Sequence, residues 1–166
     1  MNSGLTLLQP YPFERLAKLL RNSKPALDPV IPLTMGEPQH PPPVGALALL
    51  KEHAELVAKY PATQGRVQLR AAIARWLEKR FVLPSIDPEH HVLPLNGTRE
   101  GLFALAQAVV STRQAGGVIC PNPFYQIYEG AALLAGSQPL LLNCDEHNGF
   151  LPDIDLVTPA QWQKCQ

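Results

Sequence analysis

The amino-acid sequence predicts an α/β fold, in which short strands of a mostly parallel sheet alternate with helices. Apolar residues make up 46% of the 166 residues and charged residues 17%, which is typical of a folded domain with an apolar core. In the second half of the chain, three short apolar runs are separated by two segments with helical spacing of apolar residues. This order predicts a strand–helix–strand–helix–strand layer with right-handed crossovers.

The first half of the chain is predicted to be helical around a proline-rich segment. Residues 12–21 have apolar side chains at helical spacing and begin with Pro12, which suits a first helical turn. Residues 44–60, ended by Pro61, and residues 67–81 are predicted to form two further helices. Prolines crowd residues 24–45, so we expect an extended, ordered segment there, with four apolar side chains buried: Val30, Ile31, Leu33 and Met35.

The second half carries the predicted sheet. After a loop at residues 83–91, strands are expected at 91–95, 116–120 and 138–144, with helices at 99–111 and 125–136 between them. Residues 158–166 are predicted either to begin a helix or to run toward another strand. A three-stranded sheet would leave an exposed edge, and no closing element follows, so we expect the chain to be truncated.

Charge and cysteine content narrow the function classes. Fourteen basic residues balance fourteen acidic ones without a basic stripe, which argues against a nucleic-acid partner. No apolar stretch is long enough to span a bilayer, and the N-terminus lacks the pattern of a secretory signal, so we expect a cytoplasmic protein with no membrane contact. Cys120, Cys144 and Cys165 lack the spacing of a zinc site, and the adjacent His90 and His91 cannot chelate one ion from a strand, so no metal site is predicted.

Cys120 ends an apolar run, and its role is open at this point. It is either a small buried side chain or a reactive thiol.

The segment LPLNGTREGLFALAQAVV, residues 93–110, is the most informative for function. It places Gly97, Thr98 and Arg99 between an apolar run and a helix, where helix N–H groups and a partial positive charge favour an anion such as phosphate. Gly97 allows close backbone approach, Thr98 offers an N–H and a hydroxyl, and Arg99 offers an N–H and a charge. The alternative is a simply capped helix start.

The loop after the next predicted strand adds an aromatic side chain at the same sheet edge. Tyr125, in CPNPFYQIYEG, is placed to stack on a flat ligand ring, whereas a purely structural role in the core fits Phe124 better. The two loops together suggest a phosphorylated aromatic cofactor.

Four motifs resemble one known family. LTMGEPQHPPP, YPATQGRVQLRAAIARWL, VLPLNGTREGLFALAQAVV and CPNPFYQIYEGAALLAG resemble the N-terminal half of a fold-type I aminotransferase that depends on pyridoxal 5′-phosphate (PLP). Within that family, LQPYPFERLAKLL, NGTREGLFALAQ and CPNPFYQIYEGAALLAG are similar to the proteobacterial succinyldiaminopimelate transaminases. The resemblance implies a three-layer αβα fold, with residues 1–40 as an N-terminal arm and residues 41–166 as the incomplete first part of the large PLP-binding domain.

The resemblance also implies roles for individual residues. It assigns the cofactor phosphate to Gly97, Thr98 and Arg99, chiefly through backbone N–H groups, and the stacking position on the pyridine ring to Tyr125. Tyr60 matches a tyrosine that reaches the cofactor phosphate of the neighbouring subunit, which implies a homodimer. Taken alone, Tyr60 also fits a helix-end aromatic residue ahead of Pro61.

Two further residues are matched to the substrate by the same resemblance. Gly36 corresponds to a glycine whose backbone lies beside the substrate carboxylate, and Tyr11 is expected to approach the substrate entrance.

The residues that would perform the chemistry have no match in this chain. The family needs a lysine that forms a Schiff base with the cofactor and an aspartate against the pyridine nitrogen. Lys24 lies in the proline-rich segment, too early in the order, and Lys51, Lys59 and Lys79 lie on predicted helix faces. We therefore assign no catalytic residue, and expect this chain alone not to catalyse transamination.

Several functions remain open from the sequence. The resemblance implies amino-group transfer between an amino acid and a 2-oxo acid, in its narrow form between N-succinyl-LL-diaminopimelate and 2-oxoglutarate in lysine biosynthesis. Another class I/II aminotransferase or a C–S lyase of the same fold would share these motifs. A non-catalytic fragment or an interaction module of the same fold is a third possibility.

Overall fold

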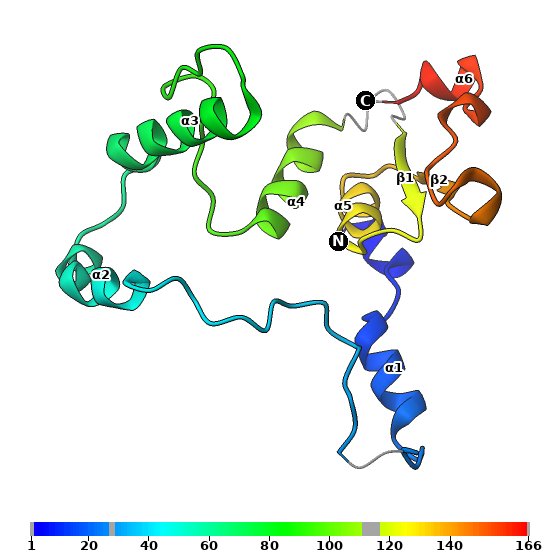
Figure 1. The fold of residues 1–166 in the computed structure, drawn as a ribbon. Helices are drawn as coiled ribbons and strands as arrows, with labels where there is room; N and C mark the ends of the chain where they lie inside the picture. Colours follow the sequence, from blue (N-terminus) through cyan, green and yellow to red (C-terminus); the bar gives the residue numbers. More distant parts are fainter. Residues whose placement is uncertain (1, 27–28, 111–116, 166) are drawn as a thin grey trace. The chain divides into compact units, whose positions relative to one another are not determined.

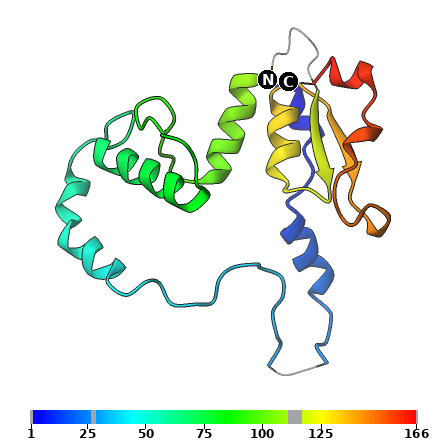
Figure 2. The same ribbon diagram turned by 45° about the horizontal axis from the view of Figure 1, so that its top comes forward.

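The chain divides into two compact units. A computed structural model describes residues 2–26, 29–110 and 117–165 (Figures 1 and 2). One unit, the sheet unit, comprises residues 1–16 and 95–166, and the other, the helical unit, comprises residues 17–94. No helix in the described residues has both the length and the apolar character needed to cross a membrane.

A two-stranded parallel sheet forms the centre of the sheet unit. Strand β1, Val118–Asn122, pairs with strand β2, Pro139–Asn143, in a register that runs from Val118 opposite Pro139 to Asn122 opposite Asn143. Helix α5, Ile127–Leu134, connects the two strands and lies alongside them (Figure 2). The core consists mainly of small residues at this contact, including Cys120, Ala131 and Ala132. The predicted α/β class and the two later strands are therefore confirmed, although β1 ends two residues later than predicted and residue 116 lies outside the described residues.

Helix α4, Thr98–Val109, packs beside α5 in the same unit. The side-chain amide of Gln107 donates a hydrogen bond to the carbonyl of Ala131 at 2.9 Å, which joins the middle of α4 to α5. The helix predicted for residues 99–111 is thus present, but it begins one residue earlier and ends at Val109, and residue 111 lies outside the described residues.

The N-terminal 3-10 helix η1, Ser3–Leu7, docks on the C-terminal end of α5. The Asn2 side chain donates to the Leu134 carbonyl at 2.8 Å and accepts from the Gly4 backbone N–H at 2.8 Å. Gly4 is buried so tightly that an added Cβ would overlap the carbonyl oxygen of Leu133. After η1 follows α1, Pro12–Leu20, which matches the predicted first helix.

The C-terminal residues fold back against β1. Two 3-10 helices, Glu146–Asn148 (η4) and Ile154–Leu156 (η5), lead to the short helix α6, Pro159–Trp162. Thr158 caps α6 by accepting a hydrogen bond from the backbone of Gln161. Cys165 then forms a single parallel bridge with Gly117. The segment thus begins a helix and also reaches the sheet.

The helical unit contains α2, Ala46–Glu52, the 3-10 helix η2, Ala54–Ala58, and α3, Val67–Phe81. The predicted α3 has the observed bounds. The single helix predicted for residues 44–60 is wrong, because the chain leaves α-helical geometry at His53, which has φ −108°. None of the residues in α2 and η2 is buried, so no packing contact favours one continuous helix, and short helices are weak without such packing.

Arg70 joins α3 to the loop that follows it. Its side chain is 4% exposed and forms an ion pair with Glu89 at 3.1 Å, with a further hydrogen bond to the Pro88 carbonyl. Residues 83–91 therefore form an ordered loop, as predicted, rather than a regular element.

Two expectations about burial and pairing are wrong. Residues 91–95 form no strand, because no other strand among the described residues pairs with them and Pro94 has no N–H to donate. The proline-rich segment is extended where it is described, as predicted, but its apolar side chains are exposed by 56% to 90%. No described element covers these four side chains: Val30, Ile31, Leu33 and Met35.

Replacing Gly4 with alanine is expected to release η1 from α5. The added methyl group would overlap the Leu133 carbonyl oxygen, and overpacking of this kind costs about 1–3 kcal/mol. Amide hydrogen exchange of residues 4–7 should become faster in Gly4→Ala and stay unchanged in Ser3→Ala, whose residue is exposed. Equal exchange rates in Gly4→Ala and the unaltered chain would contradict this packing.

Cys120 is expected to resist alkylation in the folded chain. It is fully buried, and this burial raises the pKa of its thiol, so less of the reactive thiolate is present at a given pH. Iodoacetamide at pH 8 should modify Cys144 and Cys165, which are partly exposed, well before Cys120. Peptide mass spectrometry in native buffer and in urea measures this order. Native modification of Cys120 as fast as the other two would contradict a structural role.

Candidate functional site

The N-terminus of α4 carries no side-chain cap. Gly97 is the N-cap residue, with φ 179° and ψ 150°, and no side chain among the described residues accepts a hydrogen bond from the first turn. Thr98 is the first helical residue, so its hydroxyl does not occupy the capping position. The interpretation as an ordinary capped helix is therefore not what the structure shows, and the first-turn N–H groups are available to an anion.

The space beside Gly97 is open. A Cβ atom at Gly97 would have no described atom within 4 Å, and the extended backbone there is accessible to any residue. Neither local backbone geometry nor packing within the described chain therefore requires glycine at this position. The space beside Gly97 is therefore free to admit a bound group, and a role of Gly97 in close approach stays a prediction.

Tyr125 meets the N-terminal turn of α4 through the side chain of Arg99. It lies in the loop between β1 and α5 and is 41% exposed. Nε of Arg99 donates a hydrogen bond to the Tyr125 hydroxyl at 2.7 Å, and the guanidinium carbon lies 5.6 Å from the centre of the Tyr125 ring. The structure thus brings together two residues, 26 positions apart, that the sequence analysis assigned to one site.

The charge of Arg99 is stabilised by phenol hydroxyl groups. The hydrogen bond to Tyr125 raises the pKa of the Arg99 guanidinium above its ordinary value, and Tyr11 adds a smaller effect in the same direction. Tyr11, just before α1, packs against Phe13 with a distance of 5.4 Å between the ring centres. The N-terminal arm therefore reaches the same cluster as α4 and the Tyr125 loop.

A cavity of about 590 Å³ lies beside this cluster. It is formed by the N-terminal arm, the end of β1 and the start of α5, and its polar lining includes Tyr11, Arg15, Asn122 and Glu129. This mixture of polar and apolar groups is typical of a site for a small polar molecule.

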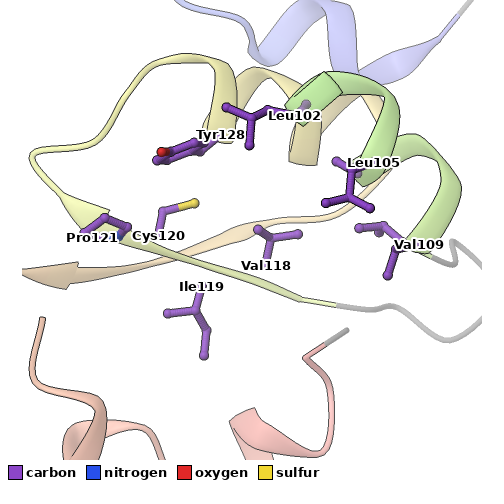
Figure 3. A pocket seen from close by; sticks show the side chains of 11 residues that line it. Leu102, Leu105, Val109, Val118, Ile119, Cys120, Pro121 and Tyr128 are labelled. Atoms are coloured by element: carbon purple, nitrogen blue, oxygen red, sulfur yellow. The ribbon is translucent and has the colours of Figure 1, made fainter. Parts of the chain in front are cut away.

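A second pocket, of about 400 Å³, is chemically different. Figure 3 shows Leu102, Leu105 and Val109 of α4 facing Val118 of β1, with Tyr128 beside them. Its mainly apolar lining offers no charged group to a phosphate.

An amide pair at the ends of the strands was missed by the sequence analysis. Asn122 Nδ2 donates to Asn143 Oδ1 at 2.8 Å, where β1 and β2 both end. The sequence pattern could have indicated this pair, because each asparagine ends an apolar run of similar length. Residues that end parallel strands lie at the carboxyl edge of the sheet, where ligands bind.

The remaining predicted site residues belong to the helical unit. Tyr60 follows η2 and is 99% exposed, and a Cβ at Gly36 would have no neighbour within 4 Å. Their assigned roles stay predictions. Among the residues that the structure describes, no group of three or more His, Cys, Asp and Glu side chains is arranged to hold a metal ion.

Comparison with known proteins gives a consistent result. The family described as aminotransferase class I and II matches residues 28–163. An aminotransferase from Neisseria meningitidis of known crystal structure is 38% identical with a TM-score of 0.90, covering 100% of this chain and 42% of that one. An aminotransferase from Helicobacter pylori is 33% identical with a TM-score of 0.86, covering 96% and 41%.

Two of the curated relatives share one name. LL-diaminopimelate aminotransferase of Dehalococcoides mccartyi is 34% identical over 90% of this chain, and the protein of the same name from Aquifex aeolicus is 33% identical over 92%. The chain spans 38% and 39% of the length of these two relatives. The match of the family over most of the chain, together with the shared fold, establishes that this chain belongs to the aminotransferase class I and II family.

Proposed function

We propose that this chain provides the phosphate-binding and ring-binding part of a PLP-dependent aminotransferase. Enzymes of the aminotransferase class I and II family use PLP. The observation that carries the proposal is the contact of Arg99, in the first turn of α4, with Tyr125 from the neighbouring loop. A helix N-terminus and an exposed aromatic ring, joined in this way, suit a flat ring that carries a phosphate group.

The residues at this position fit the cofactor. The open space beside Gly97 leaves room that a Cβ would otherwise fill, and the uncapped N–H groups of the first turn are hydrogen-bond donors for phosphate oxygens. The backbone N–H of Arg99 is one of these donors, and the face of the partly exposed Tyr125 is a stacking surface. Each of these groups complements one chemical feature of PLP: the dianionic phosphate or the aromatic ring.

In the proposed mechanism this chain binds and orients, and other residues perform the proton transfer. PLP, when bound, supplies an electron sink for amino-group transfer. Backbone N–H groups of Thr98 and Arg99 would donate hydrogen bonds to the phosphate, and the open space beside Gly97 would permit its close approach. The Tyr125 ring would limit movement of the cofactor ring and exclude water from one of its faces.

The roles of three further residues are part of the proposal. Tyr60 would contact the cofactor phosphate of a second subunit, which would make the enzyme a homodimer, and its 99% exposure in this chain is compatible with a contact to another chain. Gly36 would lie beside the substrate carboxylate, and Tyr11 would lie near the substrate entrance. Residues 41–166 would then form the first part of the large PLP-binding domain.

The proposed substrates are an amino acid of the diaminopimelate type and 2-oxoglutarate. The names of the relatives from Dehalococcoides mccartyi and Aquifex aeolicus favour LL-diaminopimelate. The motif resemblance favours the N-succinyl derivative, which belongs to lysine biosynthesis as well. Both donors carry a second carboxylate far from the reacting amino group, so the proposed substrate class is the same for both.

Replacing Gly97 with alanine is expected to weaken PLP binding without unfolding the chain. The extended backbone tolerates alanine, and the new methyl group meets no described atom, so the thermal midpoint should be unchanged. The methyl group would occupy the proposed phosphate position, at a cost of about 1–3 kcal/mol, which corresponds to roughly five- to 150-fold in the dissociation constant. Absorbance titration with PLP measures the effect.

The matched control for this substitution is Gly117→Ala. Its Cβ would make only ordinary contacts, at 3.7 Å or more, and Gly117 precedes the amino end of β1, whereas the proposed site lies at the carboxyl end. We expect its PLP dissociation constant to equal that of the unaltered protein. Equal PLP affinity in Gly97→Ala and Gly117→Ala would contradict the assignment of the phosphate to the α4 N-terminus.

A donor comparison tests the proposed substrate class. The full-length protein, loaded with PLP, should form glutamate from 2-oxoglutarate with LL-diaminopimelate or its N-succinyl derivative at a kcat/KM at least about tenfold above that for alanine, because a distal polar group adds about 1.4 kcal/mol of selective binding. The donor with the higher kcat/KM identifies whether the enzyme uses LL-diaminopimelate or its N-succinyl derivative. A preference for alanine or an aromatic amino acid would reject a diaminopimelate substrate while leaving PLP binding intact.

A further inference from the structure

The side chain of Arg99 makes a contact that phosphate binding by its backbone does not require. Its Nε–H donates to the Tyr125 hydroxyl at 2.7 Å, and the guanidinium carbon lies 5.6 Å from the ring centre. A hydrogen bond from a charged donor is shorter and stronger than one between neutral groups. The side chain therefore holds the hydroxyl end of Tyr125.

The Tyr125 ring has a second aromatic contact within its own loop and helix. Tyr128, in the first turn of α5, packs edge-on against it, with 5.8 Å between ring centres and an interplanar angle of 90°. The Tyr128 backbone N–H also donates to the Tyr125 carbonyl at 2.9 Å. Arg99 at the hydroxyl and Tyr128 at the ring together restrict rotation of the Tyr125 side chain.

No carboxylate competes for Arg99 within the part of the chain that the structure describes. The ion pairs found there join Arg70 with Glu89 and His90 with Asp87. Two phenol hydroxyls act on Arg99, with a larger effect from Tyr125 than from Tyr11, so the contact with Tyr125 is not a by-product of a surface ion pair.

We propose that Arg99 is a positioning residue for the stacking surface, whose side chain fixes the Tyr125 ring through its hydroxyl group and does not itself bind the phosphate. This inference rests on the proposed function. One residue would then serve both halves of the cofactor, because its backbone N–H faces the phosphate and its side chain orients the surface under the ring. This contact would increase the affinity for PLP by preorganisation, because a Tyr125 ring that is already fixed loses no rotamer freedom when the cofactor binds.

A double-mutant cycle for PLP affinity tests this inference. The four proteins are the full-length protein and its Arg99→Met, Tyr125→Phe and double variants, and PLP binding is measured by absorbance titration. Tyr125→Phe keeps the ring and removes the hydroxyl that accepts from Arg99. Arg99→Met should weaken binding about three- to tenfold when Tyr125 is present, the cost of immobilising a freed side chain, and less than about twofold in the Tyr125→Phe background.

The outcomes separate the two possible roles of the side chain. A loss that is large beside tyrosine and small beside phenylalanine supports the inference, as does partial recovery of affinity in Arg99→Lys, which restores a charged donor. An equal loss in both backgrounds would mean that the guanidinium binds the phosphate directly, and no loss in either would mean that it does not act on the cofactor. Each of these two results overturns the inference.

A cofactor-free measurement separates failure of this inference from failure of the proposed function. In the NMR spectrum of the chain without PLP, the Arg99 Nε–H signal should exchange slowly with water and become fast in Tyr125→Phe, while a control arginine, Arg66, stays fast in both. Slow exchange with no PLP binding by the full-length protein would reject the function but support the contact. Fast exchange in the unaltered chain would reject the positioning role even if PLP binds.

Discussion

The packing of α4 against α5 is the constraint on which the site depends. Gln107 of α4 donates to the Ala131 carbonyl of α5, and the small residues of α5 let it lie close to the sheet. Because the two helices are held together, the first turn of α4 meets the loop that leads into α5. The hydrogen bond between Arg99 and Tyr125 is a consequence of that arrangement. A shift of either helix along its axis would separate the two residues and with them the proposed phosphate and ring positions.

The N-terminal arm is joined to α5 by hydrogen bonds of Asn2 and by the close packing of Gly4. Asn2 satisfies the Leu134 carbonyl at the end of α5, and Gly4 fits against the Leu133 carbonyl because it has no Cβ. This docking directs the chain toward Tyr11, which lies close enough to Arg99 to stabilise its charge. The arm is therefore a structural part of the candidate site, although more than 80 residues separate Tyr11 from Arg99 in the sequence.

Local patterns predicted most of the helices, and predictions failed where distant contacts decide. The bounds of α3 follow from apolar spacing that one helix can satisfy alone, and β1 and β2 follow from apolar runs that pair with each other. The expected strand at 91–95 has no pairing partner in the described residues, and a strand without a partner gains no ladder hydrogen bonds. Val30 and Ile31 likewise remain exposed because burial requires a covering surface, which apolarity alone does not supply.

The sequence by itself determined the α/β class, the positions of the main helices and the residues at the N-terminus of α4. These features follow from the spacing of apolar residues and from glycine and proline, whose effects extend over only a few neighbouring positions. The sequence motifs also pointed to the family, which the comparisons established. Only the tertiary structure decided that α4 has no side-chain cap, that the space beside Gly97 is open and that Arg99 turns toward Tyr125. These features depend on how segments far apart in the chain pack together, and no local pattern encodes the direction in which a long, flexible arginine side chain finds its partner.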